Sequence, residues 1–295
     1  MTNNLISRGS IVVGVDGSPS ADAALPWAAD AAARENRPLA IIHAVHMLTA
    51  REVASFAPAG ISLRELEAQV SRDAHAIIEH AARSAEKLAP DVEITTLVRP
   101  GDPRELLLNA SEDAATVVVG SRGHGHIASL LLGSVSAALV RHAACSVAVV
   151  RRRSGVTSQG VLVSADGSTA PLAVVETAYR QASLRGLPLT VVHCLWDPFA
   201  ARVRWTYVDP KDLEYDEARS RVAESVAGMS EKFPDVELLI DVTRGAIDAC
   251  LIDMSRAHEL LVVGRGARTL SERLALPSAT TSIVEHAAST VIVVP

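Results

Sequence analysis

Short apolar segments alternate with longer, mostly helical ones along the chain. Runs rich in valine, isoleucine and leucine have the length of buried strands. The first helical segment opens with Ser18 as N-cap and Pro19 at its first position, where the missing N–H costs nothing. For the first half we predict strands at 10–15, 38–45, 92–98, 116–120 and 146–151, and helices at 19–35, 62–88, 103–114 and 134–143.

The second half of the chain repeats the first. VVGVDGSPSADAAL in the first half matches LVSADGSTAPLAVV in the second, and their Asp-Gly-Ser triplets lie 150 residues apart. PLAIIHAV matches PLTVVHCL at the same offset, and RHAACSVAVV later matches EHAASTVIVV. A duplicated domain explains matches that keep one order. The apolar pattern stops in RRRSGVTSQG near residue 155, so we predict domains at 1–155 and 156–295.

This alternation predicts parallel strands joined by right-handed crossovers. The expected fold class is α/β, with two tandem doubly wound five-stranded parallel-sheet domains of strand order 3-2-1-4-5. Ligands of such sheets bind beyond the C-terminal strand ends, where the strand order reverses. The triplet at 16–18 ends the first strand, and a glycine-rich stretch at 120–136 follows the fourth. If these two strands are neighbours, both loops meet at one nucleotide-binding site.

Composition fits a globular protein with an aliphatic core. Apolar residues make up 48% of the chain and aromatic residues only 3%, which suits a valine-rich sheet under alanine-rich helices. The net charge of −6 argues against a nucleic-acid partner. The sequence contains no apolar run long enough to cross a membrane and no apolar core of a signal sequence near residue 1. We therefore expect no membrane partner and a cytoplasmic protein. The isolated cysteines Cys145, Cys194 and Cys250 are expected to be reduced core thiols.

The glycine-rich stretch GSRGHGHIASLLLGSVS leaves one predicted strand and ends inside a predicted helix. Gly120 lets the chain turn off the strand, and Gly123 permits positive φ and the close approach of a bound group. Gly133 and Ser134 stand where the helix begins, so their N–H groups are expected to be free donors. A helix end that follows a glycine loop is an anion site suited to phosphate.

Other polar residues complete a predicted nucleotide site. Ser136 adds a hydroxyl donor and Arg122 a positive charge, while the Asp16 carboxylate accepts hydrogen bonds from ribose hydroxyls or an adenine amino group. The alternative is plain turn chemistry, because glycines often follow strands and Asp-Gly-Ser is a common turn and cap. The spacing Gly-x2-Gly-x9-Gly-Ser between strand and helix favours the nucleotide. His124 and His126 are loop residues that could touch a ligand, but we predict no metal site.

These residues resemble the ATP-binding signature of the universal stress protein family. VVGVDGS, HAV and VRPGDP are similar to its other hallmarks, and the resemblance covers essentially the whole chain as two tandem domains. It implies ATP as the ligand, either alone or with Mg²⁺. It also implies adenosine contact at Asp16, adenine contact at the Ala44 backbone, and further nucleotide and phosphate contacts at Val119, Gly120, Arg122, Gly123, Gly133, Ser134, Val135 and Ser136.

The function implied by the resemblance is regulatory ATP binding in the stress response, with the intact site in the N-terminal domain. A slow ATPase and a scaffold with relic nucleotide sites are the alternatives. No P-loop occurs and no paired acid and base stand out, so no catalytic residue is assigned. The resemblance further implies that the fifth strands, SVAVVR and TVIVV, pair within the chain as a pseudo-dimer, with assembly into a homodimer.

The second half departs from the signature. Ala267 replaces the second motif glycine, Glu272 adds a negative charge, and Pro277 stands where the first half has Gly133. Because proline lacks an N–H, we predict weak or no ATP binding in the second domain. Five of the nine aromatic residues fall within 196–215. We expect them to pack over the sheet as a satellite cluster, with a cap over the degenerate site or a partner surface as the alternatives.

Overall fold

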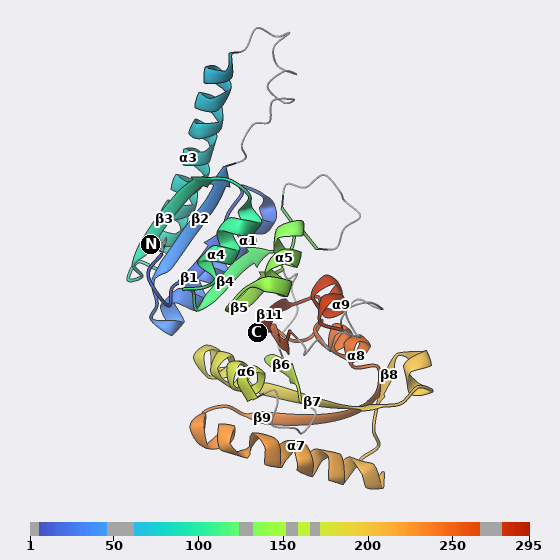
Figure 1. Ribbon diagram of the computed structural model, residues 1–295. Coiled ribbons are helices and arrows are strands. Elements are labelled where there is room, and N and C mark those ends of the chain that lie inside the picture. Colours follow the sequence, from blue (N-terminus) through green and yellow to red (C-terminus); the bar gives the residue numbers. More distant parts are fainter. Residues whose placement is uncertain (1–5, 46–61, 124–131, 152–158, 166–171, 266–278) are drawn as a thin grey trace. The chain divides into compact units, whose positions relative to one another are not determined.

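Two compact units make up the chain, and each is an α/β domain (Figure 1). The units are Met1–Val150 and Arg151–Pro295. The predicted boundary at residue 155 lies outside the described residues. The computed structural model describes residues 6–45, 62–123, 132–151, 159–165, 172–265 and 279–295.

Five parallel strands form the sheet of the first domain. Its elements are β1 (Ile11–Gly14), α1 (Pro19–Glu35), β2 (Leu39–Val45), α3 (Leu63–Leu88), β3 (Ile94–Pro100), α4 (Pro103–Ala110), β4 (Thr116–Gly120), α5 (Ser134–His142) and β5 (Ser146–Val150). The strand order is β3-β2-β1-β4-β5, as predicted. Helices α1 and α3 pack together on one face, and α4 packs with α5 on the other (Figure 1). The order reverses between β1 and β4, which is where a ligand is expected.

The second domain repeats this sheet and adds a strand. Its elements are β6 (Val161–Ser164), α6 (Leu172–Arg185), β7 (Leu189–Trp196), the 3₁₀-helix η2 (Ala200–Val203), β8 (Trp205–Tyr207), α7 (Leu213–Lys232), β9 (Leu238–Gly245), α8 (Ile247–Met254), β10 (Leu260–Gly264), α9 (Ala279–His286) and β11 (Thr290–Val294). The parallel strands follow the order β9-β7-β6-β10-β11. Strand β8 pairs antiparallel with β9, so this sheet has a sixth strand that the five-stranded prediction lacked.

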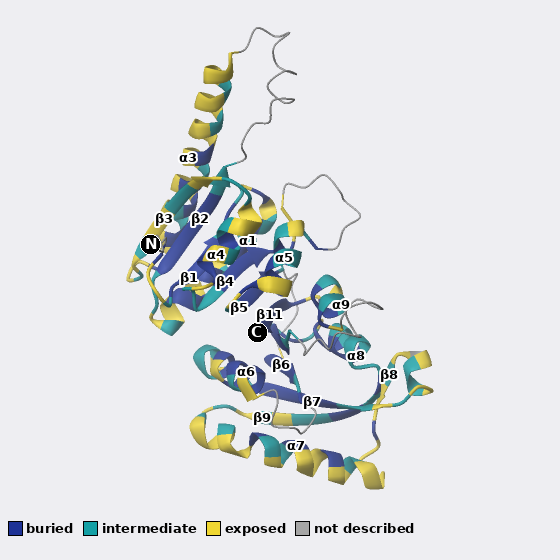
Figure 2. Cartoon of the chain, in the orientation of Figure 1, coloured by how far each residue is buried: buried dark blue, intermediate teal, exposed yellow. Residues whose placement is uncertain are grey.

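Small aliphatic side chains form the core of each domain. The inner strands are almost entirely buried because helices cover both faces of the sheet, whereas the edge strands β3, β8 and β9 are partly exposed (Figure 2). Helix α1 presents alanines to the sheet, and Ala24, Ala28 and Ala32 are all fully buried. As predicted, Ser18 caps this helix: its Oγ accepts a hydrogen bond from the Ala21 N–H at 3.3 Å. No helix among the described residues is long and apolar enough to cross a membrane.

The duplication extends to individual hydrogen bonds at the strand ends. His43 Nδ1 lies 2.7 Å from the Val15 carbonyl oxygen, and His193 Nδ1 lies 2.9 Å from that of Ala165. A carbonyl oxygen only accepts, so Nδ1 carries the proton in both rings. Each bond holds the end of the first strand against the second. These paired bonds are structural features that both halves have kept.

The aromatic segment of the second domain only partly fits the predicted satellite cluster. Tyr215 packs against a small buried group around Val208 and Val242. Trp196 and Phe199, however, are 73% and 76% exposed, so for them the predicted packing over the sheet is wrong. Strand β8 extends the sheet edge instead of folding across a face, which leaves these two rings in solvent.

Candidate functional site

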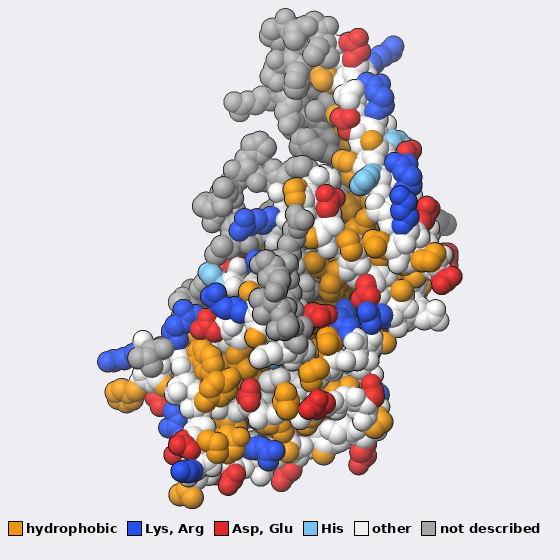
Figure 3. All heavy atoms as spheres, turned by 180° about the vertical axis from the view of Figure 1, so that it is seen from behind, with side chains coloured by type: hydrophobic (Ala, Val, Ile, Leu, Met, Phe, Trp, Pro, Cys, Tyr) orange, Lys and Arg blue, Asp and Glu red, His pale blue; other side chains and the backbone are white. Residues whose placement is uncertain are grey.

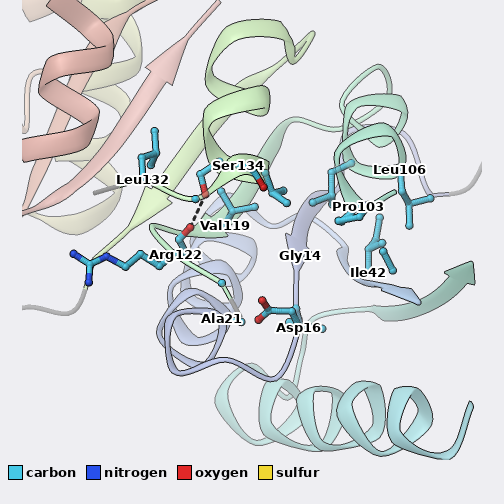
Figure 4. A pocket seen from close by; sticks show the side chains of 18 residues that line it. Gly14, Asp16, Ala21, Ile42, Pro103, Leu106, Val119, Arg122, Leu132 and Ser134 are labelled. Atoms are coloured by element: carbon cyan, nitrogen blue, oxygen red, sulfur yellow. Dashed lines mark hydrogen bonds between the residues drawn. The ribbon is translucent and has the colours of Figure 1, made fainter. Parts of the chain in front are cut away.

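A cavity of about 440 Å³ opens at the C-terminal ends of β1 and β4 in the first domain. We call it the strand-end cavity. Figure 4 shows Asp16 from the end of β1 and Ser134 from the start of α5 on its walls, with Ile42 and Leu106 to one side. All ten residues singled out in the sequence line this cavity: Asp16, Ala44, Val119, Gly120, Arg122, Gly123, Gly133, Ser134, Val135 and Ser136.

The Asp16 carboxylate occupies one wall of the strand-end cavity. It is half-buried, and its Oδ1 accepts a hydrogen bond from the Ser18 N–H at 2.9 Å, which closes the turn into α1. Gly123 lies against the other oxygen, because a Cβ at this position would stand 2.7 Å from Asp16 Oδ2. Gly123 does not have positive φ. Glycine is therefore needed at position 123 because the Asp16 carboxylate lies so close. It is not needed for the positive φ that the sequence suggested.

The N-terminus of α5 forms another wall of the cavity. Gly133 is the N-cap, and its N–H donates to the Ser121 carbonyl oxygen at 2.9 Å. The prediction that this N–H is a free donor is therefore wrong. Among the described residues, no hydrogen-bond partner is found for the N–H groups of Ser134, Val135 and Ser136. These three N–H groups stand at the positive end of the helix dipole, where anions bind.

The Ser136 hydroxyl has a structural partner. Ser136 is buried, and its Oγ donates to the Gly120 carbonyl oxygen at 2.8 Å. Thr280 makes the same bond to Gly264 in the second domain, at 2.9 Å. This hydroxyl ties the first turn of the helix to the end of the fourth strand in both halves. The expectation that it serves a ligand as a donor is corrected accordingly.

Gly120 is required by close packing. It is the last residue of β4, and an added Cβ would stand 2.6 Å from the backbone carbon and oxygen of Ser20. Contacts between such atoms normally fall near 3.5–4.0 Å. Helix α1 therefore approaches the end of β4 so closely that no side chain fits at Gly120. The sequence had suggested a turn as the reason for this glycine.

Apolar residues that the sequence reasoning missed complete the cavity wall. They come from the end of β2 and from the inner side of α4: Ile42, Pro103, Leu106 and Leu107. Asp102 caps α4, since its Oδ1 accepts a hydrogen bond from the Arg104 N–H at 2.8 Å. The sequence did carry a signal for this wall, because VRPGDP predicts that a helix starts directly at the end of β3. An apolar wall of this kind suits a flat aromatic ring such as that of a nucleotide base.

Charge on the cavity wall is modest. Arg122 is exposed, and Figure 4 shows its guanidinium extending away from Asp16. The candidate loop residues His124 and His126 lie outside the described residues. Within the described part of the chain, no group of three or more His, Cys, Asp or Glu side chains is placed to hold a metal ion.

The altered loop of the second domain, with Ala267, Glu272 and Pro277, also lies outside the described residues. The first domain nevertheless changes the argument about Pro277. In the repeat, Pro277 matches Gly133 of the first domain. The Gly133 N–H donates to the Ser121 carbonyl oxygen and does not point into the cavity. A proline here would remove a loop-closing hydrogen bond, so its effect on an anion would be indirect.

Comparison with known proteins decides the family. A family model described as the universal stress protein family matches residues 8–151 and again residues 158–295. The chain belongs to the universal stress protein family. One such protein from Mycobacterium tuberculosis (strain ATCC 25618 / H37Rv) is 33% identical over 299 residues, covering 96% of this chain and 94% of that protein. Another from the same strain is 32% identical over 301 residues, covering 96% of each.

Solved universal stress protein structures share the tandem fold. The crystal structure of a universal stress protein from Archaeoglobus fulgidus DSM 4304 superimposes with a TM-score of 0.70 at 19% identity, covering 99% of this chain and 98% of that chain. A putative universal stress protein from Pseudomonas aeruginosa UCBPP-PA14 gives a TM-score of 0.61 at 16% identity, covering 99% and 94%. The α/β class and the two tandem domains are thereby confirmed.

Proposed function

We propose that the first domain binds ATP and that the protein acts as a regulatory nucleotide binder in the stress response. One observation carries the proposal: a carboxylate acceptor and the N–H donors of a helix end line the same cavity. Its volume of about 440 Å³ falls within the range of small-molecule sites, about 300–1,000 Å³. An acceptor for a sugar and donors for an anionic tail together describe a nucleotide.

Each part of ATP has a matching wall in this proposal. The adenine ring lies against Ile42, Leu106 and Val119, with the backbone of Ala44 at its edge. The Asp16 carboxylate accepts hydrogen bonds from the ribose hydroxyls. The phosphates lie at the start of α5, where the N–H groups of Ser134, Val135 and Ser136 and the helix dipole favour negative charge. Arg122 and Gly123 are nearest to the phosphates, and Mg²⁺ would accompany the nucleotide through its phosphate oxygens.

Mass spectrometry of nucleotide released from the purified, denatured protein separates the alternatives. Released ATP supports the binder. ADP together with steady phosphate release supports the slow ATPase, and a protein that neither retains nor binds added ATP supports the scaffold. The first domain alone is expected to carry the nucleotide.

The variant Asp16→Asn tests the site directly. It keeps an oxygen for the Ser18 N–H and removes the charge that strengthens the ribose contact. Hydrogen bonds to charged groups contribute about 1.5–3 kcal/mol, so ATP affinity should fall by about 10- to 100-fold in calorimetric titration.

Asp166→Asn is the matched control, because Asp166 holds the same place in the repeat of the second domain. It should leave the affinity unchanged. Equal ATP affinity in the wild-type protein and Asp16→Asn would refute the assignment of the ribose contact. The predicted homodimer and cytoplasmic location stay predictions, and sedimentation analysis checks the former.

A further inference from the structure

A second cavity, of about 630 Å³, lies between α1 and α3 in the first domain. We call it the α1–α3 groove. Its apolar lining includes the buried side chains of Ala21, Leu25 and Ala81, together with the half-buried Ile77. Figure 3 views the molecule from behind and shows hydrophobic side chains gathered along α3, where this helix meets the rest of its domain. The groove has the volume of a small-molecule site.

Polar groups also line the same groove. Asp22 contributes a carboxylate, His80 an imidazole and Ser84 a hydroxyl. Across the described residues, none of these three side chains makes a hydrogen bond or an ion pair. Two other acidic residues on these helices are paired, Asp30 with Arg34 at 2.7 Å and Glu79 with Arg83 at 3.4 Å. Glu67 and Glu86 on α3, like the exposed Asp22, make no ion pair among the described residues.

A proline inside α1 adds an acceptor beside the Asp22 carboxylate. Pro26 stands four residues after Asp22, where an ordinary residue would donate its N–H to the Asp22 carbonyl oxygen. Proline has no N–H, so this carbonyl lacks its helical donor. An interior proline is strongly destabilising in a helix relative to alanine. Both Asp22 and Pro26 line the groove. The destabilising Pro26 therefore lies where the Asp22 carbonyl oxygen can accept a hydrogen bond from a ligand.

The second domain does not repeat this arrangement. At the repeat offset of 150 residues, Leu172 takes the place of Asp22 and Glu176 that of Pro26. Glu176 has an ordinary N–H, and its carboxylate pairs with Lys232 Nζ at 2.6 Å. The carboxylate and the freed carbonyl at the groove are therefore features of the first domain and not requirements of the shared fold.

We propose that the α1–α3 groove is a second ligand site, which takes a small organic amine with an apolar body. The ammonium group donates to the carboxylate and carbonyl oxygens of Asp22, and the apolar body lies on Leu25, Ile77 and Ala81. Since ammonium groups only donate, the acceptors at Asp22 match them, and an organic anion would face the unpaired carboxylate. The proposal is independent of ATP, although Val15 and Ala21 line both cavities.

Titration of the full-length protein with phenethylamine tests this site, with amide NMR shifts as the readout. Saturable shifts are expected near Gly17, Asp22 and Ile77. The anion 3-phenylpropionate, which has a similar apolar body, should leave these amides unchanged at the same concentration. Asp22→Leu copies the second domain and should weaken phenethylamine binding by about three- to fivefold, the scale of an exposed ion pair.

Two further variants make the result decisive. Pro26→Ala restores the helical hydrogen bond, so it should raise the melting temperature and weaken phenethylamine binding. Asp30→Asn removes a carboxylate from the same helix away from the groove and should bind as the wild type does. Equal shifts with 3-phenylpropionate, or unchanged affinity in both Asp22→Leu and Pro26→Ala, would overturn the proposal. Neither result bears on the ATP site, which is tested through Asp16.

Discussion

Replacing Gly120 with alanine should destabilise the first domain, because this glycine is the point where β4 meets α1. The added Cβ would lie 2.6 Å from the Ser20 backbone, so β4 or the start of α1 must move by about 1 Å to reach normal contact. Overpacking of this kind costs about 1–3 kcal/mol, and the lower chain entropy of alanine in the unfolded state offsets about 0.4–1 kcal/mol. We expect a net loss of about 1–2 kcal/mol.

Two other motif glycines provide internal comparisons. At Gly133 an added Cβ would meet its nearest neighbour, Arg122 Cα, at 3.5 Å, which is an ordinary contact, and the N–H to Ser121 is kept. Gly133→Ala should therefore change stability by less than about 1 kcal/mol. At Gly123 the added Cβ would meet Asp16 Oδ2, the end of a side chain that can rotate away. Rotation of that carboxylate would break its hydrogen bond to the Ser18 N–H, so Gly123→Ala should cost up to about 1 kcal/mol, less than Gly120→Ala, and should weaken ATP binding.

Thermal unfolding of the three alanine variants measures these differences. A loss of 1–2 kcal/mol lowers the Tm of a domain of this size by about 2–8 °C. Hydrogen-exchange mass spectrometry locates the change, because peptides from α1 and β4 should lose protection while those from β10 and β11 serve as a reference. Equal Tm values for Gly120→Ala and the wild type would refute the packing argument. So would an equal loss in all three variants.

Three more predictions concern individual side chains. Ser136→Ala and Thr280→Val should each cost about 1 kcal/mol in denaturant unfolding, while Ser136→Ala should leave ATP affinity within about twofold, because its hydroxyl is already bonded to Gly120. Burial raises the pKa of the Cys250 thiol to about 12, so iodoacetamide at pH 8 should label it only after unfolding, as peptide mass spectrometry would show. Burial also raises the pKa of Asp241 above its ordinary value of 3.8, so the folded protein loses stability as the pH rises through that pKa. Asp241→Asn should remove this loss and increase the free energy of unfolding at pH 7.

The sequence was sufficient for most element bounds, because these depend on local patterns. The strand order was predicted from the two polar loops that should meet at one site and not from the strand pattern. The predicted helix at 19–35 matches α1, and the predicted strand at 116–120 matches β4. Helix α4 ends at Ala110 although the prediction ran to residue 114. Beyond Ala110 the N–H groups of Glu112 and Asp113 donate to carbonyl oxygens three residues back instead of four. The extra strand β8 is three residues long, too short for its periodicity to be recognised.

The roles of individual site residues could not be predicted, because they depend on partners far away in the chain. Gly120 is a glycine because of Ser20, and Gly123 because of Asp16. A sequence pattern shows that glycine is present but not which backbone comes close to it. The same holds for the Ser136 hydroxyl, whose acceptor lies sixteen residues away. The residues that line the cavity were therefore easier to predict than the bonds each of them makes.

The duplication separates what the fold needs from what a ligand needs. Bonds that hold strand ends recur in both halves, as the Ser136 and Thr280 hydroxyls show. In the first domain Asp16 has such a structural bond, because its Oδ1 accepts from the Ser18 N–H. The triplet Asp166-Gly167-Ser168 repeats Asp16-Gly17-Ser18 in sequence, so the presence of Asp166 does not by itself favour a second ATP site. The prediction that the second domain binds ATP weakly therefore depends on its altered loop, and the Asp166→Asn control measures whether that argument is sound.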